Sequence, residues 1–173
     1  MEEKQFDVLC LGLAVQDLLL SVDRYPPPDM KVPISEMAEQ GGGPAATAAV
    51  AIARLGGRVA LVAAVGDDPR GRRILNELGR EGVDTSGCVC NPGADSPFSI
   101  VVVDRSAATR TIFYYTGSSQ LAPEQVDPEM VMKTRVLLLD ANRLEAACVA
   151  AEIAHECGVP VLLDAGEPKP ENR

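Results

Sequence analysis

The residues best suited to binding a ligand are three glycines at positions 41–43 and the segment that follows them. Residues 41–56 read GGGPAATAAVAIARLG. Glycine lets the backbone approach a ligand closely, and Pro44 suits the first turn of a helix, where its missing N–H costs little. The free N–H groups at such a helix start could bind a hydroxyl-rich or anionic ligand. A tight strand-to-helix connection whose glycines serve only packing would give the same pattern.

Three acidic residues lie within or after apolar segments. Asp17 interrupts the segment AVQDLLL, residues 14–20. A carboxylate among apolar residues needs a partner, which favours a functional acid over a solvated acid at a strand end. Asp140 and Asp164 end apolar strands, where the carboxyl edge of an α/β sheet binds ligands. Asp140 could face such a ligand, and an ordinary loop acid is the alternative.

The elements that position these residues alternate between buried strands and helices. We expect buried strands at residues 6–13, 58–66, 136–140 and 159–166, with residues 14–20 continuing the first strand. We expect helices at residues 44–55, 68–82, 123–132 and 143–157, the second beginning at an Asp68 N-cap. This alternation predicts parallel βαβ units with right-handed crossovers, and so an α/β fold with a doubly wound parallel sheet.

Two stretches fall outside this alternation. Residues 25–33, YPPPDMKVP, contain four prolines that exclude a helix, so we expect a loop leading into an extended element that ends at the glycines. Residues 98–104 and 110–117 are rich in β-forming side chains and flank a short polar connection, which predicts a hairpin. We expect these stretches to form a small β-layer that stands off the main sheet.

Composition limits the classes of partner. The 173 residues carry a formal net charge of -9, which disfavours nucleic acid and anionic membranes as partners. No apolar run reaches the roughly 18–20 residues of a membrane span, and the acidic start does not resemble a secretory signal, so we expect a cytoplasmic protein. The five cysteines match no disulfide framework, and one histidine without a CxxC pair disfavours zinc. We expect no metal site.

The run from Gly41 to Gly87 resembles the N-terminal half of ribokinase-like, PfkB-type carbohydrate kinases. After the double glycine it has an Ala-rich helix ending in ARLG, a strand closing in VGDDPRG (65–71) and a helix closing in LGREGVDTSG (78–87). The resemblance covers residues 1–173 and implies a ribokinase-like fold. It also implies a lid, residues about 25–40 and 97–117, that covers the sugar and forms a homodimer contact.

The resemblance implies sugar-binding roles for particular residues. Asp17 would bind sugar hydroxyls, and Gly42 and Gly43 would contact the sugar through their backbone. Many members have an asparagine where this chain has Thr47. A hydroxyl in place of an amide changes the hydrogen bonds available to the sugar.

The glycine-rich run is most similar to that of sulfofructose kinases. Their lid lysine falls on Lys31, which would pair with a sulfonate or another anion. The other polar sulfonate contacts of those kinases would fall on Tyr114 and Asn142. These residue types are not the expected sulfonate contacts, which argues against specificity for a sulfosugar. Ribose, fructose-type, nucleoside and sulfosugar substrates, phosphorylated or not, all fit the resemblance.

The family's GAGD motif, which supplies the catalytic base and the phosphate-binding glycines, does not occur in this sequence. The resemblance implies an ATP-dependent sugar kinase that uses Mg²⁺, of which this chain is the sugar-binding and lid half. It has no catalytic residue of its own, and we predict that the chain alone binds neither ATP nor Mg²⁺ and is inactive. The alternative is a non-catalytic sugar-binding or regulatory module. A dinucleotide-binding domain ranks lower, because its glycines should directly follow the first strand.

Overall fold

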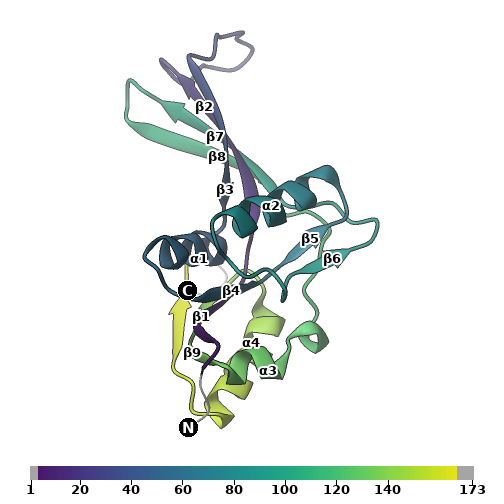
Figure 1. The fold of residues 1–173 in the computed structure, drawn as a ribbon. Coiled ribbons are helices and arrows are strands. Elements are labelled where there is room, and N and C mark those ends of the chain that lie inside the picture. The colour runs from purple at the N-terminus through teal and green to yellow at the C-terminus, as the bar shows by residue number, and fades with distance from the viewer. Residues whose placement is uncertain (1–3, 167–173) are drawn as a thin grey trace, which may run out of the picture.

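The computed structural model describes residues 4–166, which form a layered α/β unit with a second sheet standing off it (Figure 1). The main sheet has four parallel strands in the order β10-β9-β1-β4. Their bounds are Phe6–Leu11 for β1, Val59–Val62 for β4, Thr134–Asp140 for β9 and Val161–Asp164 for β10. The register places Leu9 between Ala60 and Leu137, all three fully buried. The central strands β1, β4 and β9 are near-continuous apolar runs, as expected of parallel strands that helices cover on both faces.

The helices lie on opposite faces of this sheet, as a doubly wound fold requires. Their bounds are Pro44–Arg54 for α1, Pro69–Arg80 for α2, Pro128–Met132 for α3 and Leu144–Glu156 for α4. One apolar core joins α1 and α2 to the sheet through Ala49, Leu61 and Ile74. The other joins α3 and α4 through Val131 and Ala150. The expected fold class is therefore confirmed.

The second sheet forms the β-layer that stands off the main unit (Figure 1). We call it the lid sheet, and its strand order is β3-β2-β7-β8. The bounds are Val15–Val22 for β2, Glu36–Gly42 for β3, Phe98–Asp104 for β7 and Thr109–Tyr115 for β8. Strands β7 and β8 are the expected hairpin, and β3 is the expected extended element ending at the glycines.

Strand β2 corrects one prediction. Residues 14–20 do not continue the first strand but pair with β3 and β7 in the lid sheet. Hydropathy indicated a strand here but not its sheet. The chain leaves the main sheet after Gly12, whose N–H still donates to the Val62 carbonyl, and turns at Leu13, whose N–H donates to Asp140.

Two further expected elements are divided. The strand expected at 58–66 is two strands, because Ala64–Gly66 forms β5 and pairs with β6, Val89–Asn91, rather than with β1. Strand β6 lies in a stretch rich in turn residues and was not expected. The helix expected at 123–132 is a 3₁₀ turn at Pro123–Gln125 followed by α3.

Strand β10 was expected to be buried and is exposed instead. Leu162 and Leu163 are 59% and 62% exposed, because β10 is the edge strand and no described element covers it. Leu55, the last residue of the first expected helix, lies just after the end of α1 and is also exposed. Within residues 4–166, no helix is long and apolar enough to cross a bilayer.

Candidate functional site

A cleft of about 390 Å³ lies between the lid sheet and the carboxyl ends of β1 and β9. The chain leaves β1 toward α1 on one face of the sheet, and it leaves β9 toward α4 on the other. This is the topological switch point at which open α/β sheets bind ligands. The lining residues that could contact a ligand through polar or aromatic groups include Asp17, Gly43, Ser99, Tyr114, Asn142 and Arg143.

Asp17 enters the cleft from the lid. Its Oδ1 atom accepts a hydrogen bond of 2.6 Å from the buried Ser99 hydroxyl on the neighbouring strand β7. Among residues 4–166, no cation forms an ion pair with Asp17. An unpaired carboxylate in a cleft can accept hydrogen bonds from the hydroxyl groups of a ligand.

Gly42 and Gly43 bring the backbone to the same place. A Cβ atom added to Gly42 would lie 2.1 Å from Oδ2 of Asp17, so only glycine allows this carboxylate to rest against the chain. Gly43 has a φ of 93°, and a Cβ atom there would lie 2.2 Å from the carbonyl oxygen of Leu13. The glycines therefore serve packing, and the same packing fixes Asp17 beside the start of α1.

Asp140 has a structural role that the sequence did not decide. Its carboxylate is 1% exposed. Oδ2 accepts from the N–H groups of Leu13 at 2.8 Å and Ala45 at 3.1 Å, and Oδ1 accepts from Asn142 at 2.9 Å. Asp140 thus joins the end of β9 to the β1–β2 turn and to the first turn of α1. It positions the walls of the cleft, and its oxygens bind backbone groups, not a ligand.

Two other residues named from the sequence also line the cleft. Tyr114 projects from β8 and is 77% exposed, and Asn142 follows β9. The structure therefore brings together Asp17, Gly43, Tyr114 and Asn142, with Gly42 directly behind Asp17. Sequence reasoning missed Ser99 and Arg143. Ser99 was missed because its hydrogen bond to Asp17 depends on strand pairing, which local spacing does not show. Arg143 was missed because the sequence shows only that it follows a strand.

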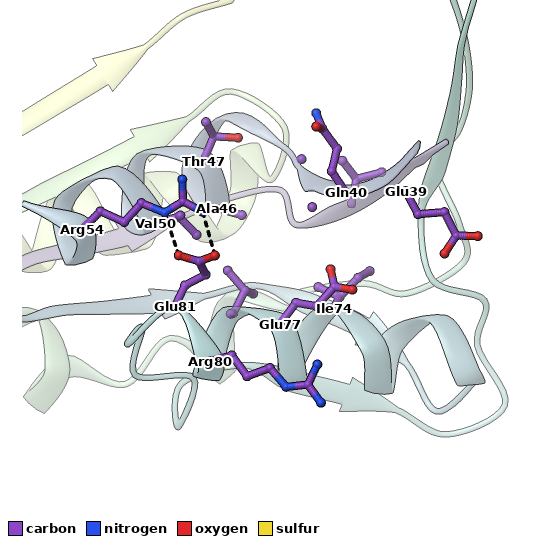
Figure 2. Close-up of a pocket in the computed structure, with 14 residues that line it drawn as sticks. Glu39, Gln40, Ala46, Thr47, Val50, Arg54, Ile74, Glu77, Arg80 and Glu81 are labelled. Atoms are coloured by element: carbon purple, nitrogen blue, oxygen red, sulfur yellow. Dashed lines mark hydrogen bonds and ion pairs between the residues drawn. The ribbon is translucent and has the colours of Figure 1, made fainter. Parts of the chain in front are cut away.

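Lys31 and Thr47 lie elsewhere. Lys31 is exposed in the loop between β2 and β3 and does not line the cleft. Thr47 is exposed on α1 and lines a separate groove of about 410 Å³ between α1, α2 and β3. Figure 2 shows this groove, with Arg54 of α1 and Glu81 after α2 joined across it by two hydrogen bonds of 2.7 Å.

The groove is a weaker candidate than the cleft. Three of its charged side chains are already engaged, because Arg54 pairs with Glu81 across the groove and Glu39 pairs with Arg73 outside it. It also lies beside α1 and α2, whereas the cleft lies at the carboxyl ends of the parallel strands. We therefore place the candidate site in the cleft.

The entry of β7 into the cleft is fixed by a polar cluster around the fully buried Ser96. Its hydroxyl donates to Asp68 at 2.7 Å and accepts from the Gly66 N–H at 2.9 Å. Asp68 also accepts from the Gly71 N–H, which confirms the expected N-cap of α2. Burial raises the pKa of Asp68, but the hydrogen bonds from Ser96 and Gly71 outweigh it and hold that pKa below its ordinary value.

The described residues offer no place for a metal ion. No group of three or more His, Cys, Asp or Glu side chains within residues 4–166 could hold one. All five cysteines are free, and burial raises the pKa of the Cys10 and Cys88 thiols to about 12. These two thiols are therefore neutral and behave as small apolar groups.

Comparison with known proteins decides the family. A family model described as pfkB family carbohydrate kinase matches residues 5–172, nearly the whole chain. The chain belongs to the pfkB family of carbohydrate kinases.

Relatives within the pfkB family share sequence as well as fold. An ATP-dependent ribose-1-phosphate kinase of Halopiger xanaduensis is 30% identical over 159 residues, covering 92% of this chain and 54% of the relative. The crystal structure of a ribokinase candidate from Agrobacterium tumefaciens superposes with a TM-score of 0.85 at 35% identity, covering 98% of this chain and 54% of that one. An Arabidopsis thaliana ribokinase complexed with ribose and ATP shares the fold, with a TM-score of 0.80 at 22% identity, 94% of this chain and 54% of that one. The chain thus spans about half the length of these relatives.

Proposed function

We propose that this chain is the sugar-binding and lid half of an ATP-dependent kinase that phosphorylates a hydroxyl group of a sugar or sugar phosphate. The single observation that carries the proposal is the unpaired Asp17 carboxylate in the cleft, held against Gly42 by close packing. A carboxylate beside the half-buried backbone of Gly43 at a topological switch point is suited to a polyhydroxylated ligand. Sugar kinases among the relatives support the same substrate class.

The proposed contacts follow from the cleft's lining. Asp17 accepts hydrogen bonds from sugar hydroxyls, and the backbone at Gly43 lies against the ring, with the buried Gly42 behind Asp17. Tyr114 covers the sugar from the lid, and Asn142 binds it from the end of β9. Thr47 lines the groove and Lys31 lies in an exposed loop, and neither lines the cleft, so we assign them no contact with the sugar.

The described residues lack a complete set of catalytic groups. No group of three or more His, Cys, Asp or Glu side chains there could hold a metal ion by itself, and the sequence has no GAGD motif to supply a base and a phosphate cradle. Phosphoryl transfer needs both positioning and stabilisation of the spread negative charge. We therefore propose that ATP and Mg²⁺ bind outside this chain's residues, and that the chain alone binds sugar without turnover. A sugar-binding or regulatory module without catalysis is the second candidate, favoured by the same missing motif.

Two further features belong to the proposal. The outer face of the lid sheet carries exposed apolar side chains, including Met37 and Phe113, which suit a homodimer contact. The free cysteines and the need for ATP suit a reducing cytoplasm. The net charge of -9 disfavours nucleic acid and anionic membrane as partners.

The test compares Asp17→Asn with the wild-type chain in a panel of ribose, fructose, adenosine and their phosphates. We expect at least one compound to raise the thermal midpoint of the wild-type chain, and Asp17→Asn to weaken its binding by about 10- to 100-fold, the worth of hydrogen bonds to a charged group. Asp23→Asn, an exposed lid residue outside the cleft, is the matched control and should bind normally. Equal binding by wild type and Asp17→Asn would remove Asp17 from the site. ADP release by the purified chain would refute the proposed lack of turnover.

A further inference from the structure

The cleft contains a cation with unused hydrogen-bonding capacity, Arg143. It lies between β9 and α4 and lines the cleft next to Asn142. Its Nε and Nη2 atoms are buried and have no hydrogen-bond partner, and they are the only such side-chain atoms within the described residues. Leaving buried charged donors unsatisfied is costly, so such donors in a binding cleft point to a missing acceptor.

The surrounding residues do not supply that acceptor. Asp140 is the acidic group whose charge acts on Arg143, but its oxygens already accept from the backbone of Leu13, Ala45 and Asn142. No ion pair between Arg143 and any carboxylate occurs in residues 4–166. Burial lowers the pKa of the Arg143 guanidinium and the charge of Asp140 only opposes that shift, which agrees with an incompletely compensated cation.

The local backbone adds a second feature that favours an anion. Arg143 is the N-cap residue of α4, a helix of 13 residues, and its side chain makes no capping hydrogen bond. The first N–H groups of α4 therefore lack a side-chain acceptor beside the guanidinium. A guanidinium group can bind a phosphate through two parallel N–H···O hydrogen bonds, and the N-terminus of a helix favours negative charge.

The cleft thus has two chemically different walls. Asp17 on the lid offers an acceptor for hydroxyl groups, whereas Arg143 on the main unit offers donors for an anion. A neutral sugar would donate hydrogen bonds to Asp17 but would leave the Arg143 donors without an acceptor. A sugar phosphate would use both.

We propose that Arg143 selects a phosphorylated sugar as the substrate by binding its phosphate group. The proposal rests on the proposed sugar-binding function and adds the substrate class to it. It assigns anion recognition to Arg143 instead of the exposed lid residue Lys31.

The experiment measures binding by isothermal titration calorimetry to the purified 173-residue chain. The ligands are ribose, ribose 1-phosphate, ribose 5-phosphate, fructose, fructose 1-phosphate and fructose 6-phosphate. We expect at least one phosphate ester to bind about 10- to 100-fold more tightly than its parent sugar. Arg143→Gln should abolish this preference while keeping the affinity for the parent sugar, and Arg143→Lys should keep part of it, because lysine provides charge without the paired donors.

Two controls separate this role from a structural one. Arg80→Gln changes an exposed arginine on α2 that lines the groove and not the cleft, and it should keep the full preference. The thermal midpoint of Arg143→Gln without ligand should not fall below that of the wild type, because the variant removes a buried, unpaired cation.

The possible outcomes distinguish the role of Arg143 from the sugar-binding function itself. Parent sugars that bind as tightly as their phosphates, or a preference that survives Arg143→Gln, would overturn the role of Arg143 and leave the sugar site standing. A large loss of stability in Arg143→Gln, with equal weakening of both ligand classes, would make Arg143 a structural residue. Binding of none of the six compounds would overturn the proposed function itself.

Discussion

At the scale of single residues, Gly42 and Gly43 are adjacent but constrained by different atoms. The Cβ of any other residue at 42 would meet the end of the Asp17 side chain, which can rotate away. At 43 it would meet the backbone of Leu13, which cannot, and φ is 93°. The first constraint concerns the placement of a proposed ligand-binding group, and the second concerns the backbone itself.

This difference gives a paired prediction. Gly43→Ala should destabilise the chain by about 1–3 kcal/mol, because alanine is strained at this positive φ and clashes with Leu13. Gly42→Ala should cost less stability and weaken sugar binding by displacing Asp17. Urea unfolding and calorimetric titration of both variants check this. A Gly42→Ala variant that binds sugar normally would contradict it.

Asp140 is the residue whose role most depends on the folded structure. Replacing it with alanine would leave three buried or partly buried N–H groups without their acceptor. We expect Asp140→Ala to lower the free energy of unfolding by about 3 kcal/mol or more, since each unsatisfied buried donor costs about 1–3 kcal/mol. Asp164→Ala is the matched control at the end of the neighbouring strand, where the carboxylate accepts, among residues 4–166, only from the Gly166 N–H, and it should cost far less in the same urea unfolding measurement. Equal losses would show that Asp140 is an ordinary loop acid.

At the scale of elements, the lid sheet is held at its outer end by Asp104, the last residue of β7. Its carboxylate accepts from the N–H groups of Tyr25 and Ala107 and from both the N–H and hydroxyl groups of Ser106. These bonds, the one from Tyr25 first, lower the pKa of Asp104 to about 2. One ionised side chain thus joins the loop after β2 to the turn of the β7–β8 hairpin.

The lowered pKa predicts how lid stability depends on pH. A carboxylate with a folded-state pKa of about 2 and an ordinary value of 3.8 stabilises the fold fully above about pH 4, and this contribution is lost as pH falls to about 2. Asp104→Asn cannot titrate. Its deficit in unfolding free energy relative to the wild type should therefore be larger at about pH 6 than at about pH 2, as measured by urea unfolding. The control Asp23→Asn should show little change between the two, and a pH-independent deficit for Asp104→Asn would contradict the assignment.

The elements also show what the sequence could and could not predict. Strands β1, β7, β8 and β9 and helices α1, α2 and α4 were predictable because hydropathy and capping residues are local. The sheet that residues 14–20 join was not, because it depends on pairing with β3 and β7. The burial of β10 was wrong for a related reason: an apolar run shows what could be buried, whereas burial needs a covering element.

The same distinction applies to the site. That Asp17 and the glycines lie close together at the cleft could be expected, because a carboxylate within an apolar segment and three consecutive glycines are unusual locally; their contact with a sugar stays a prediction. Thr47 was placed in the site by resemblance, but the rotation of α1 turns it toward the groove. Arg143 was missed because its significance comes from lacking partners in the folded structure, which no spacing in the sequence expresses.

At the scale of the whole molecule, two apolar surfaces are exposed. One is the outer face of the lid, where cross-strand pairing places the exposed Phe113 beside the half-buried Ile100 and Leu18. The other is edge strand β10 with Leu162 and Leu163. Either surface could associate with another copy, and we propose the lid because its apolar face extends over several strands.

This choice predicts the oligomeric state. By size-exclusion chromatography with light scattering, the chain should have about twice its mass of 18.3 kDa. Phe113→Glu should give the monomer, whereas Leu162→Glu, the control on β10, should stay dimeric. A wild-type monomer, or a dimer broken only by Leu162→Glu, would contradict association through the lid.

The central claim is that the cleft between the lid and the main sheet binds a sugar. The most direct test is to map amide chemical shifts by NMR while titrating the sugar or sugar phosphate that most stabilises the chain. The account predicts shifts concentrated at Leu13, Gly43, Ser99 and Asn142, with little change at Arg54 and Glu77 in the groove. Shifts concentrated in the groove, or no shifts with any compound of the panel, would contradict it.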